Sequence, residues 1–553
     1  MTSTEATTAT LTGRAIQNPV LTGFHPDPSI LRVGSDYYIA TSTFEWYPGV
    51  RLHHSTNLVD WEPLGGALNE KRLLDLTGAA DSGGVWAPSL TYAHGLFWLL
   101  YTDVATFAGG YWDPQNYLVT APSPTGPWSD PVVLHGRGFD ASLFHDEDGS
   151  TWMLSMVADA RPGNNRFAGI SIQRYDRDAR TLTGDEHMIF KGTAAEVTEA
   201  PNLYRKDDWY YLVTAEGGTS WAHQVTVARS RDILGPYEAD PAGPLLTSNG
   251  HPELTLQKAG HGSLVETPAG QWYLAHLVGR PYSTLGRCVL GRESAIQEVT
   301  WTEDGWPRIA GGIPADSVPA PLGVTVPDVR PVSSEQSEAD DFDAPELGVN
   351  WSTLRRPATP DWVDLTSRPS FLRITGGQSP MSRHRPSLVA RRVVARRCDL
   401  ETVMEFRPRN YRQLAGVTAY YNTNNWYFLN VTAEDDGTRV LGLLACDRGK
   451  VRVVDGVRVD LTGIDRIGLR VRLDGASLTF AYKVEPDAAA APWRDAGPTF
   501  DATTLSDEYA AKVVAGEPEV WGFTGAFVGL WVQDLGAEGG YAEFDRATYQ
   551  TSG

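Results

Sequence analysis

Three carboxylate residues, far apart in the sequence, hold matched places in a short pattern that occurs five times. Each copy has small residues, a short strand, a turn and an aromatic-rich strand, and the copies are marked by Ser29, Ser89, Ser142, Asn202 and Ser263. Asp27 and Asp140 stand two residues before their markers, and Glu199 stands three residues before its own. Crowded carboxyl groups acquire different pKa values, so one can hold a proton as an acid while another stays ionised as a base. If the fold brings these three together, they can perform acid–base catalysis.

The spacing of the copies predicts the architecture that would bring them together. Successive markers are 60, 53, 60 and 61 residues apart, and each copy indicates a β-hairpin with polar, Gly or Pro residues in its turn. Each interval leaves room for a four-stranded sheet, and a radial array of such sheets is a β-propeller, which closes into a ring and removes exposed edges. A solenoid also repeats, but this period is long for one and the copies are hairpins. We therefore predict a five-bladed β-propeller over residues 17–318.

Matched positions of different blades face one another across the axis of a propeller. Trp86 and His261 occupy such positions in the second and fifth copies, so we expect them beside the three carboxylates. Hydrolysis of a glycosidic bond uses this kind of set, because one carboxyl protonates the leaving oxygen while a second activates water or attacks the anomeric carbon. A third carboxylate can raise the pKa of the acid and orient it. The alternative is that each carboxylate only caps a strand or accepts a backbone N–H bond.

Composition and charge narrow the classes of function. The 553 residues include 55 Gly, 36 Pro, 18 Trp and 22 Tyr, which is typical of a turn-rich all-β protein and also suits stacking on sugar rings. With 47 basic and 68 acidic residues the net charge is −21, which disfavours binding to nucleic acid or to membrane surfaces. No apolar run reaches the length of a membrane span. Three separated cysteines, Cys288, Cys398 and Cys446, predict neither a disulfide framework nor a zinc site.

The chain outside the propeller divides into three further segments. Residues 1–16 are expected to form a flexible tail that lacks the basic and apolar parts of a signal peptide, so we expect a cytoplasmic protein. Residues 319–338 read as a linker rich in Pro, Ser and Val. For residues 339–553 we predict a β-sandwich of jelly-roll, concanavalin-like form, because runs that alternate apolar and polar residues occur again in this segment. These runs are Leu400–Phe406, Ala415–Tyr421, Trp426–Val431, Ile467–Leu473 and Phe527–Val532.

The sequence resembles glycoside hydrolase family 43, in particular its β-xylosidases, from about Asn18 to the end of the chain. The motifs that carry the resemblance are Gly23-Phe-His-Pro-Asp27-Pro-Ser, Gly84-Val-Trp86-Ala-Pro-Ser, Gly138-Phe-Asp140-Ala-Ser-Leu-Phe, Thr198-Glu199-Ala-Pro-Asn-Leu-Tyr, Thr214-Ala-Glu-Gly-Gly-Thr219, Gly260-His261-Gly-Ser-Leu-Val and Gly291-Arg292-Glu-Ser-Ala-Ile. Each motif is weak alone, but seven of them in order on a five-fold repeat are a specific signal.

The resemblance implies a role for each carboxylate. Asp27 matches the general base that deprotonates water, Glu199 matches the general acid, and Asp140 matches the residue that modulates the pKa of the acid and orients it. The residues implied to line the sugar pocket are Phe44, Trp86, Thr219, His261 and Arg292. Arg292 is chosen over Arg287 because the Gly-Arg-Glu triplet is retained there.

The resemblance also implies that the sandwich sends a loop over the propeller mouth, where Phe523 would wall the pocket. Because a walled pocket admits only a chain end, the expected activity is inverting, exo-acting release of xylose from the non-reducing end of β-1,4-xylo-oligosaccharides. The alternatives are an α-L-arabinofuranosidase, a bifunctional xylosidase/arabinofuranosidase, and a non-catalytic carbohydrate-binding propeller. No cofactor is required, although the resemblance leaves room for a calcium ion at the propeller axis near His261. It also implies a homodimer or homotetramer.

Overall fold

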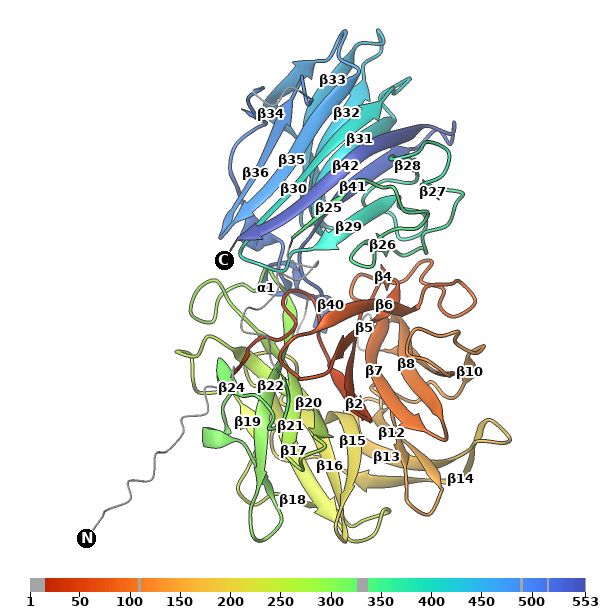
Figure 1. The fold of residues 1–553 in the computed structure, drawn as a ribbon, viewed down its shortest axis with the longest axis vertical. Coiled ribbons are helices and arrows are strands. Elements are labelled where there is room, and N and C mark those ends of the chain that lie inside the picture. The colour runs from red at the N-terminus through yellow and green to blue at the C-terminus, as the bar shows by residue number, and fades with distance from the viewer. Residues whose placement is uncertain (1–14, 108–110, 326–336, 488–490, 515–516, 553) are drawn as a thin grey trace, which may run out of the picture.

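The computed structural model describes residues 15–107, 111–325, 337–487, 491–514 and 517–552. Nearly all of its regular elements are β-strands, arranged in two stacked bodies (Figure 1). The first body, coloured red to green, is a propeller, and the second, coloured teal to blue, is a sandwich of two large sheets. The predicted all-β class and its five-bladed propeller followed by a sandwich are confirmed.

The propeller contains five antiparallel sheets, one for each sequence repeat. Their strands are β2 (Ser29–Val33), β3 (Asp36–Thr41), β5 (Gly49–Ser55) and β6 (Glu62–Leu68) in blade 1; β7 (Gly84–Ala93), β8 (Leu96–Thr106), β9 (Asp113–Ala121) and β10 (Val132–Val133) in blade 2; β11 (Ser142–His145), β12 (Thr151–Ala158), β13 (Phe167–Asp176) and β14 (Thr181–Phe190) in blade 3; β15 (Glu199–Lys206), β16 (Trp209–Glu216), β17 (Gln224–Ser230), β18 (Glu238–Ala239) and β19 (Leu246–Thr247) in blade 4; and β20 (Gln257–Glu266), β21 (Trp272–Gly279), β22 (Arg292–Trp301) and β23 (Pro307–Arg308) in blade 5.

The first strands of the five blades surround the axis, and the repeated small polar residues join them. Ser29 Oγ accepts a hydrogen bond from the backbone N–H of Leu90 in blade 2, at 2.9 Å. Ser263 Oγ accepts one from Ile30 in the same way, at 3.2 Å, which links blade 5 to blade 1. Ser142 Oγ donates to the carbonyl of blade 4 residue Pro201. The markers therefore recur because a polar side chain on the inner strand forms a hydrogen bond with a buried backbone group of the neighbouring blade.

Apolar residues on the sheet faces form a separate core between each pair of adjacent blades. Representative pairs across these five cores are Leu52 and Leu99, Leu100 and Leu143, Ile172 and Leu212, Val225 and Leu274, and Ile296 and Ile39. Side chains alternate across a strand, so each blade presents one apolar face to each neighbour. Five cores around a ring leave no blade with an unpacked face.

The start of the described chain packs against blades 1 and 5. Strand β1 (Ala15–Gln17) pairs with β24 (Ser317–Pro319), which follows blade 5, and Ile16 lies in the core between blades 5 and 1. Strand β1 thus begins inside the segment expected as a tail over residues 1–16, because Ile16 is apolar and finds a buried place. The rest of that tail, and most of the expected linker at 319–338, lie outside the described residues.

The sandwich packs two antiparallel sheets face to face. The first contains β27 (Val363–Asp364), β28 (Leu372–Thr375), β42 (Tyr541–Ser552), β30 (Arg397–Phe406), β35 (Arg466–Asp474), β36 (Ser477–Lys483), β37 (Arg494–Asp495), β25 (Ser337–Asp340) and β38 (Phe500–Asp501). The second contains β34 (Lys450–Asp460), β33 (Arg439–Asp447), β32 (Asn425–Ala433), β31 (Gln413–Asn422), β41 (Phe527–Asp534), β29 (Leu388–Arg392), β26 (Ser352–Leu354) and β4 (Trp46–Tyr47). Buried Leu, Val and Ile side chains from both sheets form its core.

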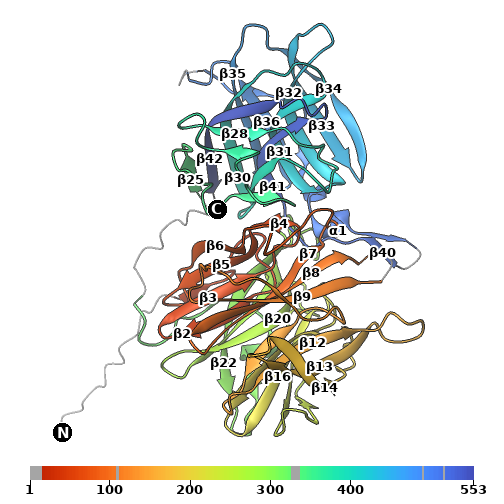
Figure 2. The same ribbon diagram turned by 90° about the vertical axis from the view of Figure 1, so that its right-hand side faces the viewer.

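The two bodies share a sheet. Strand β4 belongs by sequence to blade 1, yet it pairs with β26 at the edge of the second sandwich sheet, with Thr353 opposite Tyr47 and Leu354 opposite Trp46. In Figure 2 this strand lies at the border between the bodies, as do the helix α1 (Asp507–Ala510) and the strand β40 (Glu517–Val520), which pairs with β39 (Lys512–Val514). No helix among the described residues is long and apolar enough to cross a membrane.

Candidate active site

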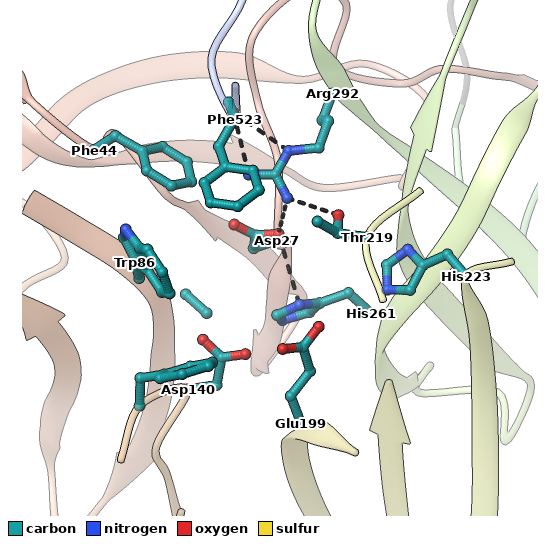
Figure 3. Close-up of a pocket in the computed structure, with 12 residues that line it drawn as sticks. Asp27, Phe44, Trp86, Asp140, Glu199, Thr219, His223, His261, Arg292 and Phe523 are labelled. Atoms are coloured by element: carbon teal, nitrogen blue, oxygen red, sulfur yellow. Dashed lines mark hydrogen bonds and ion pairs between the residues drawn. The ribbon is translucent and has the colours of Figure 1, made fainter. Parts of the chain in front are cut away.

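A pocket at the end of the propeller that faces the sandwich collects every residue expected at the site. It has an empty volume of about 390 Å³, including space open to solvent. Its lining residues are Asp27, Phe44, Trp86, Ala87, Phe139, Asp140, Glu199, Thr219, His223, His261, Arg292 and Phe523 (Figure 3). The nine residues named from the sequence are thus brought together, and Ala87, Phe139 and His223 are additional.

The matched positions share an unusual backbone as well as a common place. Asp27, Asp140, Ala200 and His261 all have positive φ, between 51° and 56°. The pairing register shifts beside Ala200 in β15 and beside His261 in β20, as in β-bulges. A bulge re-aims a side chain at the end of a strand, and left-handed backbone in residues other than glycine is found often at functional sites. These bulges help aim side chains of the inner strands at the axis.

Asp27 is surrounded by groups that favour its ionised form. Its Oδ2 accepts a hydrogen bond from Ser42 Oγ at 2.6 Å, and its Oδ1 lies 3.4 Å from Arg292 Nη1 and 3.6 Å from His261 Nδ1. The residue is only 5% exposed, and this burial opposes ionisation. Arg292, His261 and the Ser42 hydroxyl outweigh burial, so the pKa of Asp27 lies below its ordinary value. Asp27 is therefore a carboxylate at neutral pH.

Asp140 and Glu199, in contrast to Asp27, lie in surroundings that favour the protonated form of a carboxyl group. Burial is the largest cause that raises the pKa of Glu199, to about 8, and the charge of Asp27 adds to it. Burial also raises the pKa of Asp140 well above its ordinary value, followed by repulsion from Glu199 and Asp27. Arg292 opposes both increases but does not cancel them. Protons lost from two such close groups belong to the pair, so the pair retains a proton at pH values where Asp27 is ionised.

Arg292 joins the catalytic carboxylate to the sandwich. It is the first residue of β22, and its Nη1 donates to Thr219 Oγ1 at 2.9 Å while also facing Asp27. Its Nε and Nη2 donate to the carbonyl of Phe523 at 3.3 and 3.1 Å. The rings of Phe44 and Phe523 lie 5.3 and 5.1 Å from the guanidinium carbon, within the range of cation–π contacts. Arg287 instead pairs with Asp501, and Arg292 is the arginine that lines the pocket.

Two facing glycines let the sandwich loop reach the propeller. Gly291 has φ of 75°, and a Cβ there would lie 2.4 Å from the carbonyl oxygen of Thr524. A Cβ on Gly525 would lie 2.6 Å from the carbonyl oxygen of Leu290. Ala526 N–H donates to the carbonyl of Val289 at 2.9 Å, which fixes the approach. Because neither glycine has a side chain, the backbones touch and Phe523 lies over the pocket.

Aromatic rings form one wall of the pocket. The ring of Phe523 lies 5.9 Å from that of Phe44 and 5.7 Å from that of Trp86, and Trp86 also packs edge to face on Phe139 at 5.1 Å. Apolar ring faces of this kind suit the C–H faces of a sugar. The sequence repeat could have indicated Phe139, since it stands at the same place as Trp86, three residues before its marker.

His223 is a pocket residue that sequence reasoning missed. Its Nδ1 lies 3.0 Å from the carbonyl of Lys258, which can only accept, so Nδ1 carries the proton. Burial, followed by the nearby His261, lowers the pKa of His223 to about 3, so the ring is neutral. Its position depends on Gly260, where a Cβ would meet the ring at 2.3 Å. His223 lies at the far end of a loop rather than on the repeat, and only its closeness to Thr219 in sequence could have indicated it.

A metal ion gains no support at this site. In the ranges that the structure describes, no group of three or more His, Cys, Asp or Glu side chains is arranged to hold one. Arg292 already supplies a positive charge beside Asp27, and a second cation there would be repelled. Burial lowers the pKa of His261, with Asp27 opposing and Arg292 assisting. The calcium ion allowed near His261 is therefore not supported.

Comparisons with known proteins cover most of the chain. The profile of glycosyl hydrolases family 43 matches residues 16–307, and that of the β-xylosidase C-terminal concanavalin A-like domain matches residues 339–550. The xylosidase/arabinosidase 43B of Humicola insolens is 44% identical, with 97% of each chain covered. The xylan 1,3-β-xylosidase of a Vibrio species is 43% identical and covers 97% of this chain and 99% of its own.

A solved structure has the same two-body arrangement. The xylan β-1,4-xylosidase from Bacillus halodurans C-125 is 47% identical, covers 97% of this chain and 100% of its own, and superposes with a TM-score of 0.92. Enzymatic relatives of this length, together with three intact carboxylates in one pocket, favour hydrolysis over the alternative of a non-catalytic carbohydrate-binding propeller. The chain belongs to glycosyl hydrolases family 43 and is a glycosidase.

Proposed function

We propose that this enzyme releases xylose from the non-reducing end of β-1,4-xylo-oligosaccharides with inversion of the anomeric configuration. The observation that carries the proposal is the pair of opposite charge states in one pocket: the pKa of Asp27 is lowered while that of Glu199 is raised to about 8. The similar full-length proteins are called xylosidases or a xylosidase/arabinosidase, which supports xylose as the terminal sugar.

Asp27 acts as the general base and Glu199 as the general acid. Asp27 accepts a proton from a water molecule as the water oxygen attacks the anomeric carbon. Glu199 donates its proton to the glycosidic oxygen as the bond from that oxygen to the anomeric carbon breaks. The products are xylose of inverted configuration and a chain one residue shorter, and a proton then returns from Asp27 to Glu199 through solvent. Asp140 shares the retained proton with Glu199, since the two groups titrate as a pair.

The walls of the pocket favour attack at a chain end. Phe523 from the sandwich, Phe44 and Trp86 from the propeller, and Phe139 behind them enclose one side of a small cavity. Thr219 and His261 offer polar groups on the other side. A cavity closed in this way accommodates a terminal sugar and leaves the rest of the chain at the mouth, so we propose exo action.

Product stereochemistry on xylobiose tests reaction and mechanism together. Proton NMR of the first minutes of hydrolysis is expected to detect α-xylose before it equilibrates in water. β-Xylose as the first product would contradict the proposed inversion, and no release of xylose would contradict the proposed substrate. A parallel reaction on β-1,3-xylobiose resolves the linkage, because one similar enzyme is a xylan 1,3-β-xylosidase.

A second activity, on terminal α-L-arabinofuranosides, is proposed beside the first. The similar Humicola enzyme is called a xylosidase/arabinosidase. The matched nitrophenyl β-xyloside and α-L-arabinofuranoside measure the two activities in one assay. A specific rate on the arabinofuranoside below about a thousandth of the xylosidase rate would exclude it as an activity of this enzyme.

We also propose a cytoplasmic location. All three cysteines, Cys288, Cys398 and Cys446, are buried free thiols, which persist in a reducing compartment. Fractionation of the producing cells tests the location.

The homodimer or homotetramer expected from the resemblance stays a prediction, and light scattering of the purified protein measures the oligomeric state.

A further inference from the structure

Ser82 lies at the border between the propeller and the sandwich and makes three hydrogen bonds that meet at the active site. It belongs to the loop before β7, is 1% exposed, and has φ of 59°. Its Oγ accepts from the backbone N–H of Phe523 at 3.0 Å. Its carbonyl accepts from the indole N–H of Trp86 at 2.9 Å, and its own N–H donates to Glu45 Oε2 at 3.1 Å. One residue therefore contacts two aromatic walls of the pocket and one buried acid.

Glu45 connects this point to the third aromatic wall. It follows Phe44 directly, is fully buried, and precedes the strand β4 that joins the sandwich sheet. Phe44 itself exchanges backbone hydrogen bonds with Val85, at 2.9 and 3.0 Å. The chain that carries the Phe44 ring is thus held on one side by Val85 and on the other by the Glu45 contact with Ser82.

Behind Glu45 and Ser82 lies a buried ion pair between the two bodies. Arg355 of the sandwich donates from Nη2 to Asp81 of the propeller at 2.7 Å and from Nε to the carbonyl of Ala79 at 2.8 Å. Its backbone N–H donates to the carbonyl of Glu45 at 2.9 Å. Thr423 of the sandwich also donates to Asp81, from its hydroxyl and from its backbone. Breaking a buried ion pair of this kind strongly destabilises a protein, so the pair fixes the loop that carries Ser82.

The hydrogen bond from Phe523 to Ser82 matters for the site because of what else Phe523 does. Its ring covers the pocket, and its carbonyl accepts both hydrogen bonds from the Nε and Nη2 atoms of Arg292. Arg292 in turn faces Asp27. A displacement of the Phe523 backbone would therefore move an aromatic wall and loosen the guanidinium that faces the base.

We propose that Ser82 is a positioning residue, which ties the Phe523 loop of the sandwich to the buried Glu45–Asp81–Arg355 cluster and so sets the shape of the sugar pocket. The proposal rests on the proposed function only in naming the sugar. It gives the sandwich a defined part in the reaction, since the sandwich supplies both Phe523 and the arginine that anchors the Ser82 loop. The competing account is that the Ser82 hydroxyl merely stabilises a turn.

The test removes the hydroxyl and leaves the two backbone bonds of Ser82 in place. Ser82→Ala deletes the acceptor for Phe523, and Ser82→Gly does the same while relieving the left-handed backbone, so the glycine variant is expected to fold. The control is Thr503→Val, which removes a different hydrogen bond between the two bodies, from Arg287 Nη1 to Thr503 Oγ1 at 2.8 Å; neither residue lines the pocket. For each variant, kcat and KM on xylobiose and the inhibition constant of xylose are measured, together with the thermal midpoint.

Both Ser82 variants are expected to raise KM and the xylose inhibition constant about tenfold, as for loss of one buried hydrogen bond that positions a binding wall. We expect kcat to change by less than about threefold, and the Thr503→Val values to stay within about twofold of the wild type. Unchanged KM and inhibition constants in both Ser82 variants would overturn the proposal, and so would an equal rise in Thr503→Val. The rate of the wild-type enzyme on xylobiose tests the proposed function separately from the role of Ser82. If arabinofuranosides were the better substrate, the same variants would be compared with arabinose as the inhibitor.

Discussion

Two regions of the same pocket hold the same chemical group in opposite states. On one side, Asp27 lies beside Arg292, His261 and a serine hydroxyl, and its pKa is lowered. On the other side, Asp140 and Glu199 lie close to each other and are buried, and their pKa values are raised. All three residues lie at or just before the start of inner strands of matched blades, so their position in the repeat does not separate them. The placement of Arg292, His261 and Ser42 beside Asp27 does, and this is what allows one fold to present a base and an acid together.

The largest effects are expected from removing either member of the acid–base pair. Asp27→Asn leaves water without a proton acceptor, and kcat/KM on xylobiose is expected to fall about 10⁴-fold. Glu199→Gln removes the proton donor, and a similar fall is expected. Steady-state kinetics measure both, with circular dichroism as the check that each variant is folded.

The leaving group separates the two roles. A dinitrophenol leaves readily without protonation, so Glu199→Gln should recover most of its kcat on dinitrophenyl β-xyloside, to within about tenfold of the wild type. Asp27→Asn should gain nothing from the better leaving group, because water activation is still lost. If Asp27→Asn were rescued and Glu199→Gln were not, the two regions would have to exchange roles.

Removing the cation should remove the largest influence that keeps Asp27 ionised. In Arg292→Met, the guanidinium that lowers the pKa of Asp27 is gone, so the acidic limb of the kcat/KM profile is expected to move to higher pH. The rate at its optimum is expected to fall about 10²- to 10³-fold. The matched control is Arg287→Met in the same segment, whose partners are Asp501 and Thr503. Its profile should coincide with that of the wild type, and an unmoved acidic limb in Arg292→Met would contradict the electrostatic account.

Smaller effects of opposite sign are expected in stability. The folded-state pKa of Glu199 is raised from 4.5 to about 8, so its contribution is fully present below pH 4.5 and is lost as the pH rises through 8. Glu199→Gln stays neutral, and its thermal midpoint at pH 8 should exceed that of the wild type by about 2 °C. The pKa of Asp27 is lowered, so its contribution is present above about pH 4 and is lost at lower pH. Asp27→Asn should therefore melt lower than the wild type at pH 7, and the difference should shrink on acidification. Calorimetry at matched scan rates measures both, and shifts of the same sign would contradict the comparison.

Much of this arrangement could be predicted from the sequence, because the residues concerned hold matched positions in the five-fold repeat. The markers such as Ser29 and Ser263 repeat because each inner strand must satisfy its neighbour's backbone, and that regular need is visible in the sequence. The convergence of Asp27, Asp140 and Glu199 follows from the same regularity.

Other features depend on contacts that no local pattern reveals. Strand β4 leaves blade 1 to pair with the sandwich because Leu354 and Thr353 lie at an open sheet edge nearby. His223 enters the pocket because Gly260, on another strand, leaves room for its ring. The separation of pKa values depends on where Arg292 lies, and its place is set in turn by the carbonyl of Phe523 on a different domain.

The pH dependence of kcat/KM on xylobiose tests the central claim most directly, because it reports the base and the acid of the free enzyme in one curve. We predict a broad plateau, bounded on the acidic side below the ordinary range of an aspartate by Asp27 and on the alkaline side near pH 8 by Glu199. In Glu199→Gln the alkaline limb should disappear while the acidic limb stays. An alkaline limb between about pH 4 and 6, as for an unperturbed carboxyl group, would contradict the account.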